Sequence, residues 1–333
     1  MEKQERINYI DIARAFAIFL VVLGHTLTSG RIRTAVYAFH MPLFFIISGM
    51  LLKRKDAEFT EEDLLKVLKK RTFSYYIPYL VWGLFYSALS MDTLIKILYG
   101  TRKMLDQVKT LTSLWFLPTL LVASVISEIV LFSIKKIHNH IAGVAGFCIL
   151  FFAVGFGLPR ISPYGYPMNF NVGCVAAGFM LLGYLLKNIN IFCYRSVGSC
   201  AVITLISVLF FIVVFHFLPP TIGKVAMYEG GYGNIPIFMA NALMGSFSVI
   251  SLACLFDRIF TTNMLLNLVG KNTMGILVIH KPIVEYGDKI VTAWGLSNND
   301  IHVALVITVI GCILSLFLTI IITRIVPELL GKG

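Results

Sequence analysis

The amino-acid sequence predicts an all-α integral membrane protein, a polytopic bundle of about ten transmembrane helices with amphipathic helices at the membrane interface. Composition is the first observation: 58% of the 333 residues are hydrophobic, 14% are charged, and the mean hydropathy is +0.84. Soluble domains are about half apolar and about a quarter charged. The second observation is that the apolar residues form blocks of about twenty, the length that spans ~30 Å of hydrocarbon. We expect a single transmembrane domain over residues 1–333.

Ten such blocks follow one another along the chain. Their approximate bounds are 9–28, 34–52, 73–91, 113–134, 140–158, 169–187, 196–218, 233–256, 264–284 and 302–325. The segment between the second and third blocks, residues 53–73, is basic and has an apolar side. This pattern is typical of a helix that lies on the membrane surface. Residues 92–110 show a similar pattern, which we expect on the opposite side of the membrane.

The positive charges predict the orientation. If both termini are cytoplasmic, sixteen Lys and Arg residues lie on the cytoplasmic side, nine lie outside, and Arg14, Lys271 and Lys281 fall within spans. Cytoplasmic loops carry the excess of positive charge in membrane proteins. We therefore expect a multi-pass protein of the cell membrane with both termini inside. The net charge of +11 has the same explanation, and nucleic-acid binding is not expected because no basic run is interleaved with aromatic residues.

Neither a disulfide framework nor a metal site is expected. The six cysteines are Cys148, Cys174, Cys193, Cys200, Cys254 and Cys312. No CxxC spacing occurs among them, and five of the six lie in apolar segments, where cysteine behaves as a small hydrophobe. The first apolar block has no small-residue cleavage site and contains charges. We therefore expect it to remain in the protein as a helix.

That first block, YIDIARAFAIFLVVLGHTL (residues 9–27), contains three ionisable residues that hydrocarbon does not tolerate without partners. Arg14 and His25 are eleven residues apart, a rotation of about 1100°, so both project from one helix face about 16 Å apart along the axis. Asp11 lies three residues before Arg14, where the two side chains can pair. We expect this face to look into the helix bundle or into a polar cavity.

The helix geometry is compatible with two interpretations of these residues. Arg14 can be a snorkelling residue paired with Asp11, and His25 can be a packed, hydrogen-bonded histidine near the outer interface. The alternative is a functional site, because ionisable residues within membrane spans often mark one. The shared face of Arg14 and His25 favours the functional interpretation for His25.

Five sequence motifs carry a family resemblance. The first is the arginine of the opening block, followed after ten residues by the histidine. The others are FHMPLFFIISGMLLKRK (39–55), LKKRTFSYYIPYLVW (68–82), SLWFLPTLL (113–121) and LVGKNTMGILVIHKPI (268–283). In this order they resemble the membrane-bound acyltransferase-3 family, whose core has ten spans. The last motif departs from the family pattern, with Thr273 where Ser is common and Ile276-Leu277 where Ile-Tyr is common.

The resemblance implies an enzyme that transfers an acyl group, most often acetyl, from acetyl-CoA to a hydroxyl of a cell-surface glycan or its lipid-linked precursor. Its partners would be that glycan or glycolipid and the membrane lipids. It is of the O-acetyltransferase type, and we expect it to lack the extra span and periplasmic hydrolase-like domain of some relatives. The oligomeric state is not predicted.

In this interpretation His25 is the general base, because histidine titrates near neutral pH and can take the proton of the acceptor hydroxyl. Arg14 holds a donor phosphate or the thioester carbonyl, where a fixed cation in low dielectric is strongest. Asp11 holds Arg14 in one rotamer. Together these are the predicted catalytic residues, with Arg14 also assigned to donor binding.

Five further residues are candidates, each with a plainer alternative. Arg71 and Lys271 are candidate contacts for donor phosphate; the alternatives are a positive-inside residue and a snorkelling lysine. Ser48 is a candidate substrate contact, although the Ser-Gly pair also suits close helix packing. Trp115 can stack on substrate or anchor the chain at the interface. His40 can contact substrate or partner the helix break expected at Pro42.

His280 lies in the same predicted span as Lys271. Nine residues separate them, a rotation of about 900°, so on an ideal helix the two side chains face opposite sides. A structural role is favoured for His280. The alternative to the enzyme as a whole is a transporter or flippase for a polar glycolipid, with Asp11, Arg14 and His25 along its path; the inverted repeats common in transporters are not evident here.

Overall fold

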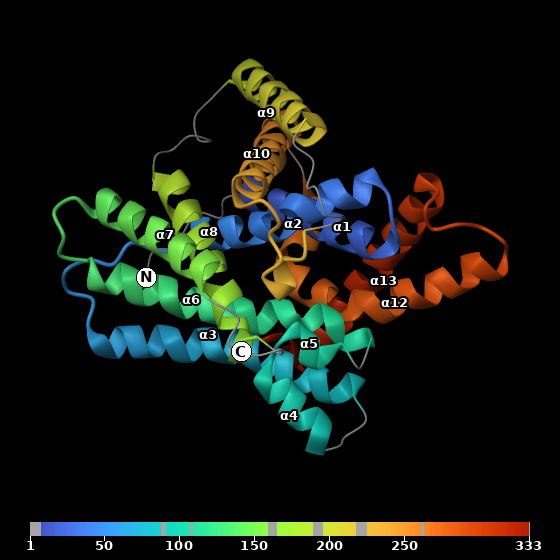
Figure 1. The fold of residues 1–333 in the computed structure, drawn as a ribbon, viewed down its shortest axis with the longest axis horizontal. Coiled ribbons are helices and arrows are strands. Elements are labelled where there is room, and N and C mark those ends of the chain that lie inside the picture. Colours follow the sequence, from blue (N-terminus) through green and yellow to red (C-terminus); the bar gives the residue numbers. More distant parts are fainter. Residues whose placement is uncertain are drawn as a thin grey trace. The chain divides into compact units, whose positions relative to one another are not determined.

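The computed structural model describes residues 8–87, 91–106, 109–158, 165–188, 196–217, 225–260 and 263–332. Cys193 lies outside them. The described chain is mainly helical (Figure 1), with connecting loops and turns and one isolated bridge between Ala226 and Gly231. Its α-helices are α1 (Asn8–Thr26), α2 (Arg31–Met50), α3 (Glu61–Tyr86), α4 (Met91–Tyr99), α5 (Arg102–Leu105), α6 (Phe116–Ser133), α7 (His140–Gly157), α8 (Phe170–Asn188), α9 (Val197–Phe217), α10 (Ile235–Ile259), α11 (Met264–Lys271), α12 (Thr273–Ala293) and α13 (Ile301–Ile325). The 3-10 turns are η1 (Lys109–Trp115), η2 (Pro167–Asn169), η3 (Met227–Glu229) and η4 (Pro327–Leu330).

The chain folds into two compact units, each built from several segments. The first unit comprises Met1–Ile47, Asn190–Val225 and Gly233–Thr319; the second comprises Ser48–Ile189, Ala226–Tyr232 and Ile320–Gly333. The first unit thus contains α1, α9, α10, α11, α12 and most of α2 and α13. The second contains α3 to α8 with the 3-10 turns. The predicted single domain stays a prediction.

The structure confirms an all-α polytopic membrane protein. Eight helical segments of the described chain are long and apolar enough to cross a membrane: Asn8–Thr26, Arg31–Met50, Leu111–Ser133, His140–Gly157, Pro167–Asn188, Val197–Phe217, Ile235–Ile259 and Ile301–Ile325. The other two predicted spans, 73–91 and 264–284, correspond to α3 and to α11 with α12. These helices carry clustered charges, so their composition alone does not mark them as spans.

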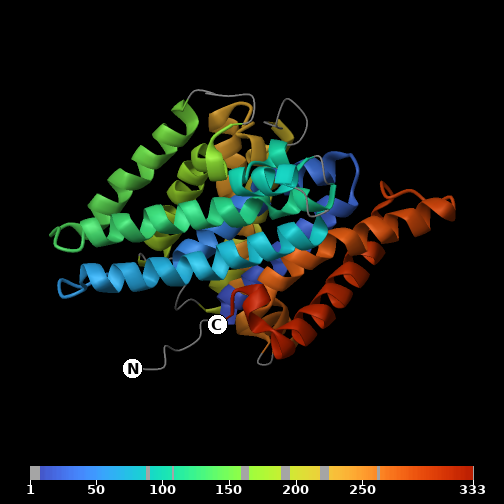
Figure 2. The same cartoon turned by 90° about the horizontal axis from the view of Figure 1, so that it is seen from below.

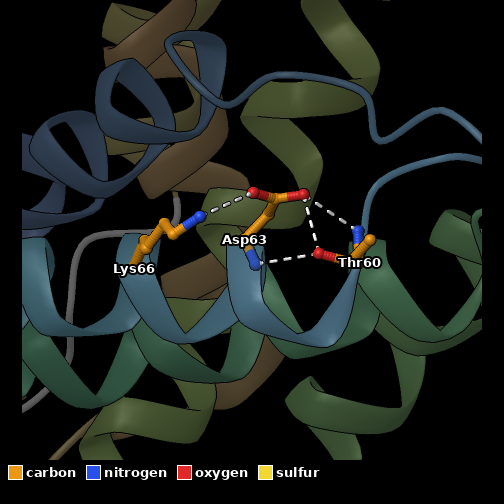
Figure 3. Close-up of polar contacts among 3 residues, drawn as sticks. All are labelled: Thr60, Asp63 and Lys66. Carbon is orange, nitrogen blue, oxygen red and sulfur yellow. Dashed lines mark hydrogen bonds and ion pairs between the residues drawn. The ribbon is translucent and has the colours of Figure 1, made fainter.

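The predicted surface helix at 53–73 and the predicted span at 73–91 form one continuous helix, α3, which starts later than expected. A capping box fixes the start (Figure 3): the Asp63 N–H donates to the Thr60 hydroxyl, and the Thr60 N–H donates to the Asp63 carboxylate. Such a box satisfies two backbone donors that a helix leaves open. The hydrogen bond from the Thr60 backbone holds the pKa of the Asp63 carboxyl below its usual value, and Lys66 adds a weaker contribution. Residues 92–110 hold α4 and α5 in place of one helix.

The predicted span 264–284 is interrupted. Helix α11 ends at Lys271, Asn272 has φ −112° and ψ 14°, and α12 begins at Thr273 and continues to Ala293. Lys271 and His280 therefore do not share one ideal helix, and the rotation of about 900° between them does not set them on opposite faces. The break leaves His280 on a helix whose direction is independent of α11.

In the first unit, α1 is the element that the others surround. Helices α10, α11 and α12 all pack against it, and the Phe16 ring of α1 meets the Phe256 ring of α10 edge to face at 5.3 Å. Helix α12 lies along α13 (Figure 2), where a Cβ at Gly275 would come within 2.2 Å of the Thr319 side chain. Helix α9 packs along α10 and is otherwise largely exposed and apolar, which suits contact with lipid.

In the second unit, α3 and α6 lie side by side (Figures 1 and 2), and α8 packs between α6 and α7. The C-terminal turn η4 returns to α3, where the indole N–H of Trp82 donates to the Leu329 carbonyl at 2.9 Å. The end of α2 approaches α8 so closely that a Cβ at Gly49 would lie 1.8 Å from the Met180 carbonyl oxygen. The Ser48-Gly49 pair therefore does permit close helix packing, one of its two predicted uses.

Replacing Gly49 with alanine should weaken this packing. The new Cβ has no room beside the Met180 backbone, and overpacking of this kind costs about 1–3 kcal/mol or more. We expect a lower thermal unfolding temperature and a lower yield of monodisperse protein in detergent. The control is Gly146→Ala on α7, where an added Cβ meets nothing within 4 Å. Equal stability of the two variants would contradict the packing described here.

Candidate functional site

Helix α1 places its ionisable residues on one face. It runs without interruption from Asn8 to Thr26, so the predicted common face of Arg14 and His25 applies along its whole length. The Arg14 Nη1 lies 3.8 Å from the Asp11 Oδ1, and the Asp11 side chain is almost fully buried while about a third of the Arg14 side chain is exposed. The pair predicted between Asp11 and Arg14 is therefore present. The catalytic roles of these residues stay predictions.

A glycine brings Lys271 to the Asp11 end of α1. A Cβ at Gly270 would lie 2.0 Å from the Asp11 carbonyl oxygen, so α11 touches the α1 backbone directly at this point. Lys271 follows Gly270 in the chain and is exposed. Two of the three predicted donor-binding cations, Arg14 and Lys271, thus belong to the same end of α1. Such a pair of cations can hold phosphate groups.

The other end of α1 carries an aromatic and imidazole cluster, the histidine cluster, formed by His25, Tyr37, His40 and His280. The ring centroids of His25 and His280 are 5.2 Å apart with an interplanar angle of 45°. The Tyr37 ring of α2 lies 6.4 Å from His25 and 4.9 Å from His40. Gly24 makes room for this, since a Cβ there would be 3.1 Å from the Tyr37 ring.

The tautomers of two histidines in the cluster follow from their hydrogen bonds. The Nδ1 of His40 lies 2.7 Å from the Val36 carbonyl oxygen, and the Nδ1 of His280 lies 3.0 Å from the Ile276 carbonyl oxygen. A carbonyl oxygen only accepts, so each Nδ1 carries the proton. In the neutral ring the Nε2 then holds a lone pair. The cluster therefore presents imidazole nitrogens that can accept protons or hydrogen bonds.

Arg33 of α2 contacts the Tyr37 ring of the histidine cluster. Its guanidinium lies 5.0 Å from the Tyr37 ring centroid, and its Nη1 donates to the Thr28 carbonyl at 2.8 Å. Helix α2 continues through Pro42 to Met50, so the helix break expected there is not found. His40 bonds to Val36 and faces Tyr37. Its predicted contact with substrate remains a prediction.

In the second unit, Arg71 belongs to a buried charge cluster, formed by Lys55, Arg71 and Glu128. The Arg71 Nη2 donates to Glu128 Oε1 at 2.9 Å, and the Lys55 Nζ lies 2.8 Å from Glu128 Oε2. The side chains of Lys55 and Glu128 are only 6% and 2% exposed, and that of Arg71 is 30% exposed. One carboxylate thus orients two cations, and Arg71 keeps an accessible part for an anionic ligand.

The two remaining candidates also lie in the second unit. Trp115 is buried, directly precedes α6, and its ring lies 6.1 Å from that of Tyr228. Ser48 is half-buried beside Gly49. The stacking role predicted for Trp115 and the substrate contact predicted for Ser48 are not tested by the geometry.

Sequence reasoning missed two residues. The structural role favoured for His280 did not foresee its place beside His25, and Glu128 was not singled out at all. In both cases a signal existed, because an ionisable residue in an apolar block is by itself a candidate for function. Glu128 is the only acidic residue between positions 113 and 134.

Comparison with known proteins identifies the family of the chain. A family model described as an acyltransferase domain, that of the acyltransferase-3 family, matches residues 7–324. The match covers nearly the whole chain and both compact units. No curated protein matches the chain. The family match favours an enzyme over the transporter alternative.

Removing the charge of Glu128 should destabilise the second unit. In Glu128→Gln the buried Lys55 loses its counter-charge, and breaking a buried ion pair from one side costs about 3–5 kcal/mol. We expect a clear drop in the thermal unfolding temperature in detergent, which the double variant Lys55→Met/Glu128→Gln partly reverses. The exposed Glu62→Gln of α3 is the control. A Glu128→Gln protein as stable as this control would refute the role of the buried charge cluster.

Proposed function

Because the chain belongs to the acyltransferase-3 family of membrane acyltransferases, we propose that it transfers an acetyl group from acetyl-CoA to a hydroxyl of a cell-surface glycan or its lipid-linked precursor. The observation that carries this proposal is the arrangement on α1. A paired arginine lies toward one end of the helix and a partly exposed histidine, adjoining a second histidine, lies toward the other.

The histidine supports the proton transfers that the reaction needs. The acceptor oxygen attacks the thioester carbonyl carbon, a C–O bond forms, and the C–S bond to coenzyme A breaks. His25 takes the proton from the attacking hydroxyl and returns it to the departing thiolate, which leaves as free coenzyme A. Histidine suits this exchange because both of its protonation states are accessible near neutral pH.

The cations support donor binding. Acetyl-CoA carries phosphate groups at one end and the thioester at the other, separated by the pantetheine arm. Arg14, oriented by Asp11 at 3.8 Å, and the nearby Lys271 offer fixed positive charge at the N-terminal end of α1. With both termini in the cytoplasm, this end faces the compartment that supplies acetyl-CoA, and His25 lies nearer the outer side. In the second unit, Arg71 is oriented by Glu128; a role for it in donor binding is proposed separately from the site on α1.

The variant His25→Ala should lose acyl transfer. Purified protein is incubated with radiolabelled acetyl-CoA, with and without a candidate glycan, and release of free coenzyme A and labelling of the glycan are followed. Loss of the general base should lower kcat by about 100-fold or more. His302→Ala, at an exposed histidine of α13, is the control. A correctly inserted His25→Ala protein with full activity would rule out this role.

The variant Arg14→Ala should weaken donor binding. A fixed arginine contact to phosphate is charge-assisted, and losing a hydrogen bond to a charged group costs about 1.5–3 kcal/mol. We expect the KM for acetyl-CoA, and its Kd from radioligand binding, to rise by about 10-fold or more. Arg324→Ala, at an exposed arginine of α13, is the matched control. Unchanged affinity for acetyl-CoA would exclude Arg14 from the donor site.

A further inference from the structure

His280 has one nitrogen fixed and the other without a hydrogen-bond partner among the described residues. It is fully buried on α12, and its Nδ1–H donates to the Ile276 carbonyl at 3.0 Å. Its Nε2 is buried and has no such partner in the described part of the chain. A buried polar atom without a hydrogen bond is costly, by about 1–3 kcal/mol, and calls for an explanation. The ring beside it is that of His25.

The separation of the two rings fits a hydrogen bond between them. In an N–H···N contact the nitrogens lie about 3 Å apart, and each nitrogen is about 1.1 Å from its ring centroid, so the centroids of a bonded pair are about 5.2 Å apart. The centroids of His25 and His280 are separated by 5.2 Å. The bond requires an orientation of the partly exposed His25 ring that directs one of its nitrogens at Nε2.

We infer that His280 is the positioning residue for His25: its Nε2 accepts the N–H of His25 and thereby orients the other His25 nitrogen toward substrate. The inference deepens the proposed function and rests on it. When His25 takes the proton of the acceptor hydroxyl, the resulting imidazolium donates to Nε2 of His280. When His25 passes a proton to the thiolate, the ring returns to the neutral tautomer. A base oriented by a third group is the general arrangement of activated catalytic sites.

The surroundings of the pair support this role. On α12, the ammonium of the neighbouring Lys281 lies 3.7 Å from Glu285 Oε1. On the α2 side, Tyr37 lies next to His25, with Arg33 on the Tyr37 ring and His40 held by Val36. On α13, the Thr308 hydroxyl donates to the Ala304 carbonyl. The Nε2 of His280 is a buried acceptor without a hydrogen-bond partner among the described residues, and the His25 ring lies beside it.

Two amide variants separate this role from simple packing. The oxygen of a glutamine side chain reaches the position of Nε2, so His280→Gln keeps an acceptor facing His25. The shorter asparagine reaches the position of Nδ1, so His280→Asn keeps the bond to the Ile276 carbonyl and loses the acceptor. If His280 only packs against its own helix, asparagine is the better substitute. If His280 positions His25, glutamine is the better substitute.

The experiment compares both variants with the intact protein in two assays. The first measures kcat and KM with radiolabelled acetyl-CoA. We expect His280→Asn to lower kcat about 100-fold with an unchanged KM for acetyl-CoA, and His280→Gln to lose no more than about tenfold. The second measures the rate at which diethylpyrocarbonate modifies His25, read by mass spectrometry of the His25 peptide. This rate should fall about tenfold in His280→Asn and stay near the original in His280→Gln, because a hydrogen-bonded partner raises the basicity of a histidine.

The outcomes separate the two ideas. If kcat and the reactivity of His25 are as high in His280→Asn as in His280→Gln, in protein of equal thermal stability, the inference is overturned while the proposed function stands. If the intact protein releases no coenzyme A from acetyl-CoA yet His25 reactivity follows the predicted order, the proposed function fails and the coupling of the two histidines holds. If both variants unfold, His280→Phe with normal stability but low His25 reactivity supports the inference, and normal reactivity overturns it.

Discussion

An ionisable side chain within a membrane must have a partner, and this constraint organises the whole protein. Hydrocarbon offers neither water nor counter-charge, so each charge or imidazole in a span has to be met by another group of the chain. Asp11 meets Arg14, the His25 ring meets that of His280, and Glu128 meets Lys55 and Arg71. The Asp11–Arg14 contact lies within α1, whereas the contact of His25 with His280 joins α1 to α12 and that of Arg71 with Glu128 joins α3 to α6. Helix α9 has its one imidazole, His216, in its last turn and packs along α10.

Small residues allow helices to approach one another closely. Gly270 lets α11 touch the backbone of α1 at Asp11, Gly24 lets Tyr37 approach beside His25, and Gly49 lets α2 touch the backbone of α8. In a membrane, helices associate mainly by close packing, since there is no water to drive apolar surfaces together. A side chain at any of these positions would separate the helices by the width of a methyl group or more.

The same arrangement gives the proposed chemistry its direction. On α1 a cationic end and an imidazole end are separated by about 16 Å, so the proposed reaction would recognise donor phosphates and acceptor hydroxyl at different depths. The partners differ in kind as well. Arg14 is held by a carboxylate, which keeps a cation in place for an anionic donor. His25 adjoins a neutral imidazole, which allows it to gain and lose a proton without a permanent counter-charge.

The sequence by itself determined the membrane class, the helical segments and the polar face of α1. These depend on composition and on the spacing of residues along one helix, which are local properties. It placed most of the spans, and the Asp11–Arg14 pair followed from a spacing of three residues. The later start of α3 follows from the local capping box of Thr60 and Asp63, whereas the break at Asn272 was not predicted from the spacing. The partners of His25 and Glu128 were decided only by the tertiary structure, because no spacing along a helix tells which distant segment packs against it.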